Sequence, residues 1–303
     1  MNATPPESFP ATPSSAPVAA PAAPLLYESH SHTTLCKHSV GHPEEFAAVG
    51  FARGLKGLIV TCHCPMPNGY SAGVRMSPEQ FPEYLQLVRG TAETWADRMD
   101  VLLGLESDYV PGMEGWLEKL HTEAEFHYIL GSVHPHIAEY KKKYYNGDPF
   151  DYQKLYFTHL AQAAETGLFD SLAHPDLVKN EKPKYWNVEK ILPYICASLD
   201  RIAATGIAME LNTSGLNKSF PEMNPGPVIL KEMAARGIPV VLGADAHRPT
   251  RVADKYEEAL ALLKEAGFSH IRVYKHRKPQ SIAIEDALNS LRPIQPATPA
   301  PAA

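Results

Sequence analysis

The sequence has no apolar run long enough to span a lipid bilayer, little cysteine and no excess of positive charge. Its 303 residues include four cysteines, Cys36, Cys62, Cys64 and Cys196, without a paired Cys-X-X-Cys spacing. This number is too low for a disulfide-built secreted scaffold, so we expect free thiols, a cytoplasmic location and no membrane partner. The formal net charge of −6 argues against a nucleic-acid-binding surface. An anionic substrate would therefore need local positive charge, which bound metal ions can supply.

The two ends of the chain lack large apolar side chains. Residues 1–24 are rich in Pro, Ala and Ser, without the basic start and apolar stretch of a signal peptide. We predict that residues 1–24 and 293–303 are disordered, because they bury too little surface to offset chain entropy. The chain as a whole is 44% hydrophobic. That fraction allows a sizeable core, so we predict one domain over residues 25–292.

Between the ends, short apolar runs alternate with amphipathic stretches. The predicted strands are Leu25–Ser29, Gly57–Thr61, Val101–Leu105, Tyr128–Val133, Phe169–Ala173, Ile207–Leu211, Pro239–Gly243 and Ile271–Tyr274. Helices are predicted from Pro43, over Pro78–Asp97, Gly115–Glu123 and Tyr152–Thr166, from Val188, and over Pro227–Arg236 and Val252–Ala266. The strand-then-helix order predicts an α/β protein with a parallel sheet, and seven or eight such units favour a closed, TIM-like barrel.

Polar residues with metal-binding side chains follow almost every predicted strand. In strand order they are His30 with His32, then His63, Glu106, His134, His174, Asn212, and Asp245 with His247. The carboxyl ends of the strands of a parallel barrel share one face, so these residues should converge there. A single histidine after a strand is usually a satisfied polar residue, but six in this position indicate a metal site.

The spacing of these residues supports shared ions. His30 and His32 are two apart, as are Asp245 and His247, which places each pair on one side of a strand. Imidazole and carboxylate are ligands for Zn, Fe or Mn, and the set is too large for one tetrahedral ion. We therefore expect two or three ions, with Glu106 suited to bridge two of them through its two oxygens.

The cysteines compete for a place among the ligands. Cys62 and Cys64 flank His63, so strand geometry turns them away from it, and packing is their expected role. Cys36 lies near His38 and could approach the site.

The chain resembles the PHP (polymerase and histidinol phosphatase) superfamily in a set of short motifs. They are His30-Ser-His32-Thr, Thr61-Cys-His63, Gly104-Leu-Glu106, Gly131-Ser-Val-His134, Ala173-His174-Pro-Asp and Gly243-Ala-Asp245-Ala-His247-Arg, in family order. Further stretches resemble the monofunctional histidinol-phosphatase branch. They are Cys36-Lys-His38-Ser-Val-Gly-His42-Pro-Glu, Pro65-Met-Pro, Arg75-Met and Asn212-Thr-Ser-Gly-Leu.

This resemblance implies a distorted (β/α)7 barrel with three metal ions. One ion would be held by His30, His32, Glu106 and Asp245; Glu106 would bridge to a second ion on His134 and His174; His38, His63 and His247 would hold the third. Many family members have Asp immediately before the second-strand histidine, where this chain has Cys62. A cysteine there would differ from aspartate as an orienting residue or a ligand.

The implied activity is hydrolysis of a phosphate monoester, L-histidinol phosphate, in histidine biosynthesis. We expect a hydroxide bridging two metal ions to attack phosphorus in line, with Glu106, Asp245 and His247 as catalytic residues. The leaving group's proton donor is open between Asp245, His247 and Asp176. Arginine suits phosphate oxygens, so Arg75 and Arg248 are the candidate clamps, and His42 and Asn212 are candidate substrate contacts.

Two other functions fit the same motifs. One is another PHP-type phosphoesterase, such as a nucleotide phosphatase, a phosphodiesterase or nuclease, or a tyrosine phosphatase; a nuclease would benefit from a basic track, which is not evident. The other is a non-catalytic metal-binding module. Every principal ligand position holds a competent residue, which argues against that module.

Overall fold

The computed structural model describes residues 23–293, so most of the two end segments predicted to be disordered, 1–24 and 293–303, lies outside the described residues. The strands pair in chain order, and all neighbours are parallel except the last two. They are β1 (Tyr27–Ser31), β2 (Gly57–Val60), β3 (Asp100–Asp108), β4 (Tyr128–Ser132), β5 (Ser171–Leu172), β6 (Ala208–Asn212), β7 (Val240–Gly243), β8 (His270–Lys275) and β9 (Lys278–Ala283).

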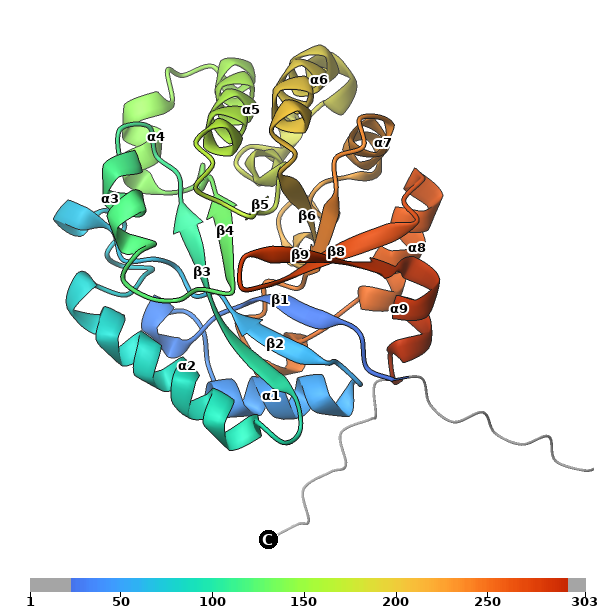
Figure 1. Ribbon diagram of the computed structural model, residues 1–303. Helices are drawn as coiled ribbons and strands as arrows, with labels where there is room; N and C mark the ends of the chain where they lie inside the picture. Colours follow the sequence, from blue (N-terminus) through green and yellow to red (C-terminus); the bar gives the residue numbers. More distant parts are fainter. Residues whose placement is uncertain (1–22, 294–303) are drawn as a thin grey trace, which may run out of the picture.

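The sheet closes on itself between its first and seventh strands. The backbone N–H of His32 donates to the carbonyl of Ala246 at 3.0 Å, and the N–H of Ala246 donates to the carbonyl of His30 at 2.9 Å. β8 pairs with the start of β7 at Val241 and carries the antiparallel β9 outside the closure. The parallel seven-stranded barrel predicted from the sequence is therefore confirmed (Figure 1).

Helices surround the barrel on its outside (Figure 1). They are α1 (Pro43–Ala52), α2 (Phe81–Trp95), α3 (Glu114–Leu120), α4 (Ala138–Tyr144), α5 (Pro149–Glu165), α6 (Val188–Thr205), α7 (Pro227–Ala235), α8 (Tyr256–Ala266) and α9 (Ile284–Ser290). The sequence analysis missed α4, α9 and β9. β9 is mostly exposed, so it lacks the apolar pattern of a buried strand, and α4 carries three consecutive lysines. No helix within residues 23–293 has both the length and the apolarity of a membrane span.

Successive side chains along each strand point alternately toward the surrounding helices and toward the barrel interior. On β2, Leu58 and Val60 join the large core under the helices, whereas Ile59 joins a small cluster with residues of the other strands. On β3, Leu102 belongs to that small cluster, and Glu106 lies four residues on, with the same parity. The strand faces that carry the small apolar cluster thus carry polar side chains nearer the carboxyl ends.

Three predicted strand positions need correction. His30 lies inside β1, Glu106 lies inside β3 and Asn212 is the last residue of β6, although all three were expected to follow their strands. The first strand was predicted to begin two residues too early because Leu25 and Leu26 are apolar. The strands continue through buried polar residues, which apolar patterning does not detect.

Candidate metal centre

The nine predicted metal ligands converge at the carboxyl end of the barrel. Seven of them line a cavity of about 350 Å³: His38, His63, Glu106, His134, His174, Asp245 and His247. The remaining two, His30 and His32, are buried beside Glu106 and Asp245. Residues separated by more than two hundred positions in sequence therefore form one cluster.

Glu106 is the centre of this cluster, and its two oxygens face different histidines. Oε1 lies 3.2 Å from Nε2 of His134 and 3.0 Å from Nε2 of His174. Oε2 lies 3.5 Å from Nε2 of His30 and 3.6 Å from Nε2 of His32. A carboxylate between two pairs of imidazoles has the arrangement needed to bridge two cations.

A second carboxylate, Asp245, joins the remaining histidines to this cluster. Its Oδ1 lies 3.1 Å from Nε2 of His32 and 3.2 Å from Nδ1 of His247. The rings of His38 and His247 stack with centroids 4.5 Å apart. Asp245 has a φ of +51°, a conformation that costs roughly 1–3 kcal/mol and is typical of functional sites.

The donor atoms fit a group of metal ions. Among the described residues, Nε2 of His30, His32 and His247 and Oε2 of Glu106 are buried without a hydrogen-bond partner. Nδ1 of His63 lies 2.7 Å from Oε2 of Glu106, yet neither atom makes a hydrogen bond with acceptable geometry. Buried polar atoms left unpaired are costly, and cations between them would satisfy all of these lone pairs.

Two buried acids that the sequence analysis missed face histidines that are predicted ligands. Oε1 of Glu210 lies 2.7 Å from Nδ1 of His30, and Oδ1 of Asp108 lies 2.9 Å from Nδ1 of His134. Glu106 and Asp245 are therefore not the only acids at this centre. Their spacing could have indicated them, because residues two apart on a strand point to the same face. Asp108 is two residues after Glu106, and Glu210 is two before Asn212.

A glycine makes room for one of these acids. A Cβ on Gly243 would lie 2.2 Å from Oε1 of Glu210 and 2.7 Å from Cβ of His30. Any larger residue would push Glu210 away from His30, so the motif glycine before Asp245 keeps this acid beside a predicted ligand.

Acids and imidazoles in the cluster shift one another's protonation. Burial opposes charge on His134, but Asp108 and Glu106 outweigh it and raise the pKa of His134 to about 10. Burial lowers the pKa of His63 to about 3, although Glu106 pulls it upward. Burial also opposes charge on Glu106, but the histidines around it hold its pKa well below the usual range. In the absence of metal, protons on some imidazoles balance the buried carboxylates.

The predicted substrate contacts are scattered. Arg75 lines the cavity, whereas Arg248 is exposed and His42 caps the start of α1, accepting from the N–H of Glu44. Asn212 is buried and donates to Glu210 at 3.0 Å, which makes it a neighbour of the ligand-orienting acid.

Two polar residues that the sequence analysis did not name as site residues line the cavity, His136 and Lys218. Lys218 lies 3.8 Å from Oδ2 of Asp245 and brings a positive charge to the cavity. His136 follows His134 by two residues, a spacing that could have indicated it. Asp176 instead pairs with the buried Lys179 at 3.0 Å and lines a different cavity.

Residues 28–214 match the profile of the PHP domain. The chain belongs to the PHP domain family. This PHP protein is 37% identical over 265 residues to a "Probable histidinol-phosphatase" of Deinococcus radiodurans, a match that covers 84% of this chain and 98% of the relative. It is 23% identical over 269 residues to a histidinol-phosphatase of Bacillus subtilis, covering 77% of this chain and 97% of that protein.

A solved structure has the same barrel. It is the histidinol phosphate phosphatase of Lactococcus lactis, crystallised with zinc, L-histidinol and phosphate. The TM-score is 0.72 at 20% identity, with 84% of this PHP chain and 98% of that chain covered. The likeness confirms the fold that the motifs implied.

Proposed function

We propose that this PHP protein is a histidinol-phosphatase, which hydrolyses L-histidinol phosphate to L-histidinol and phosphate. The observation that carries the proposal is Glu106, with its two oxygens between two pairs of histidines at the base of a cavity. The relatives from Deinococcus and Bacillus bear the name of this activity, and the Lactococcus protein was crystallised with both products of the reaction.

The ligand set suits two or three ions of Zn, Fe or Mn. His30, His32, Glu106 and Asp245 would hold the first, Glu106 with His134 and His174 the second, and His38, His63 and His247 the third. Bound divalent ions neutralise a phosphate dianion and lower the pKa of water toward neutrality.

The protein's own residues would position the phosphate and move the proton. Lys218 brings an ammonium group to the cavity lining, and Arg75 also lines the cavity. Asp245 and His247 also line the cavity, so they are the candidates for donating a proton to the departing alkoxide. The ion pair of Asp176 with Lys179 leaves that acid out of the role.

The substrate test is a panel of phosphate esters. We expect kcat/KM for L-histidinol phosphate to exceed that for a nucleoside monophosphate, a phosphotyrosine peptide and a chromogenic phosphodiester. Preference for any of the others would replace the proposal with that phosphoesterase. Zinc without turnover of any ester would indicate a non-catalytic metal-binding module.

All four cysteines are free thiols, which supports the expected reducing, cytoplasmic compartment.

A further inference from the structure

Most of the ligand histidines have the same supporting contact. The ring nitrogen Nδ1 meets an oxygen acceptor, which leaves Nε2 to face the cavity or the other ligands. The pairs are His30 with Glu210 at 2.7 Å, His134 with Asp108 at 2.9 Å, His38 with the carbonyl of Cys36 at 2.7 Å, and His247 with the carbonyl of Asp245 at 3.0 Å.

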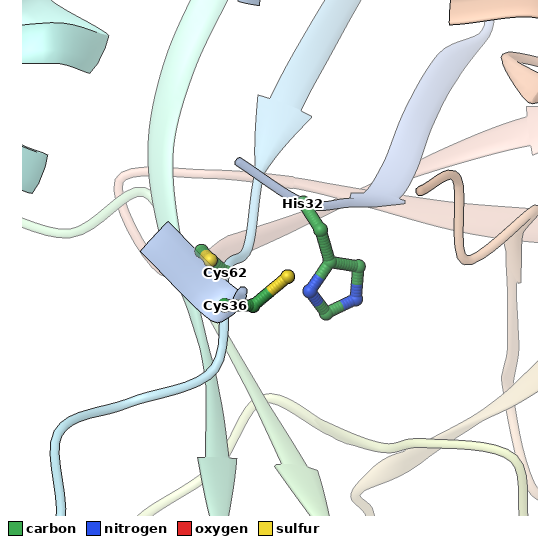
Figure 2. Close-up of side chains that lie close together, drawn as sticks. All are labelled: His32, Cys36 and Cys62. Atoms are coloured by element: carbon green, nitrogen blue, oxygen red, sulfur yellow. The ribbon is translucent and has the colours of Figure 1, made fainter. Parts of the chain in front are cut away.

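The contact is missing at His63, whose Nδ1 faces Oε2 of Glu106, and at His174, whose buried Nδ1 has no partner among the residues described. It is also missing at His32. Its ring is buried, and its Nδ1 has no hydrogen-bond partner among the residues described. Figure 2 shows this nitrogen turned toward the sulfur of Cys36, with the sulfur of Cys62 beyond. A ring nitrogen of His32 and the two sulfurs all lie within 4.8 Å of one another. The Nε2 atom lies on the opposite edge, 3.1 Å from Oδ1 of Asp245.

Neither thiol is among the residues that line the cavity. Both are fully buried, and Oγ1 of Thr33 donates to Sγ of Cys62 at 3.2 Å. The thiol of Cys62 in turn faces the carbonyl of Thr33 at 3.7 Å. Thr33 directly follows His32, so this contact ties the second strand to the backbone of the ligand.

We infer that Cys62, supported by Cys36, is the positioning residue of His32. Nδ1 makes no hydrogen bond here, and with an ion beside Asp245 and Glu106 the sulfur of Cys62 would accept the Nδ1 proton. That contact would fix the ring tautomer and leave the Nε2 lone pair for the ion. This inference rests on the proposed metal centre. Cys62 therefore has the part that Glu210 and Asp108 have for His30 and His134, with sulfur in place of a carboxylate.

The choice of sulfur has a consequence for the bound ion. Sulfur is a larger and weaker acceptor than a carboxylate, so it polarises the imidazole less and makes His32 a weaker donor. The ion held by His32 should then leave more readily than the ion held by His134, which is supported by Asp108.

The experiment compares Cys62→Ala, Cys62→Ser and Cys62→Asp in the full chain, with Cys196→Ala as the matched control. Cys196 lies on α6 and is partly exposed. Zinc retained per chain is measured against graded chelator, and cobalt-loaded protein is examined for a sulfur-to-cobalt charge-transfer band. Circular dichroism checks that each variant is folded.

We expect Cys62→Ala to weaken the binding of one ion by about 10- to 100-fold. Cys62→Ser should restore part of the affinity, and Cys62→Asp should equal or exceed the original protein. Cobalt should give no sulfur band. Unchanged zinc retention in Cys62→Ala would overturn the inference, as would a sulfur band that disappears with Cys62, because the thiol would then be a ligand. If Cys62→Ala does not fold, zinc retention is compared among the other proteins. Retention by Cys62→Asp that equals or exceeds that of the original protein, with Cys62→Ser lower, supports the inference, and any other order overturns it.

A failure of the proposed function can be distinguished from a failure of the inference about Cys62. It would show as zinc-loaded original protein that does not hydrolyse L-histidinol phosphate, whatever the Cys62 variants do to zinc retention.

Discussion

Arg75 and Asp108 form a buried ion pair in which Nη2 donates to Oδ2 at 2.6 Å. The other carboxylate oxygen of Asp108 faces Nδ1 of His134 at 2.9 Å. Arg75 also donates from Nη1 to the carbonyl of Cys64 at 2.9 Å. The arginine therefore holds the carboxylate that faces the predicted ligand His134, and most of the guanidinium donors already have acceptors. Only the guanidinium donors of Arg75 that lack a protein acceptor could bind phosphate, which limits its predicted role as a phosphate clamp.

Replacing Asp108 by Asn should affect both stability and metal binding. The buried charge of Arg75 loses its partner, a change that typically costs about 3–5 kcal/mol. His134 loses its acceptor, so zinc affinity should fall by about 10- to 100-fold. Urea unfolding and zinc titration measure the two effects. Asp97→Asn, at an exposed position, is the control. A variant that matches the control in both measurements would refute the role of Asp108.

Replacing Glu106 by Gln removes the charge between the two pairs of histidines. Zinc content should fall, and hydrolysis of L-histidinol phosphate should drop by at least about 100-fold. Metal analysis and steady-state kinetics on the same preparation test this, with Glu118→Gln on the exposed side of α3 as the control. A full rate in Glu106→Gln would mean that Glu106 does not bridge ions.

The metal-free protein should be most stable near pH 6.5. Folded His134 has a pKa of about 10 against about 6.5 unfolded, so its stabilisation is complete below pH 6.5 and lost as the pH rises toward 10. Folded His63 has a pKa of about 3, so its contribution is present above pH 6.5 and lost as the pH falls toward 3.

Melting temperatures of chelator-treated protein from pH 4 to pH 10 would show this maximum. His134→Gln should lose less stability than the original protein between pH 7 and pH 10. A metal-free protein whose melting temperature rises steadily over that range would contradict the expected protonation of His134.

Substitutions of Lys218 and Arg248 should differ in their effect on inhibition by inorganic phosphate. Lys218 lines the cavity, so Lys218→Met should weaken inhibition by inorganic phosphate by about 10-fold, the value of one charge-assisted hydrogen bond. Arg248 is exposed outside the lining, and Arg248→Met should change the inhibition constant much less. The reverse order would restore Arg248 as the clamp that its sequence position suggested.

Sequence reasoning identified residues by position along strands. His30, His63, His134 and His174 could be found because strand ends in a parallel barrel share one face, whatever the details of packing. The same reasoning named Arg75 as a phosphate clamp, although Arg75 is paired with Asp108. It did not name Lys218, which lines the cavity. Loop residues have no periodicity, so their positions depend on how the loop folds over the barrel.

The sequence by itself determined the barrel and the family and predicted a ligand set, because strand-helix alternation and motif order are local properties of the chain. Only the tertiary structure decided which groups face the second ring nitrogen of the predicted ligand histidines. Glu210 reaches His30 from a strand 180 positions away, and Cys62 lies behind His32 from β2's end. Such contacts depend on strand register and closure, in which a shift of one residue would exchange the two faces.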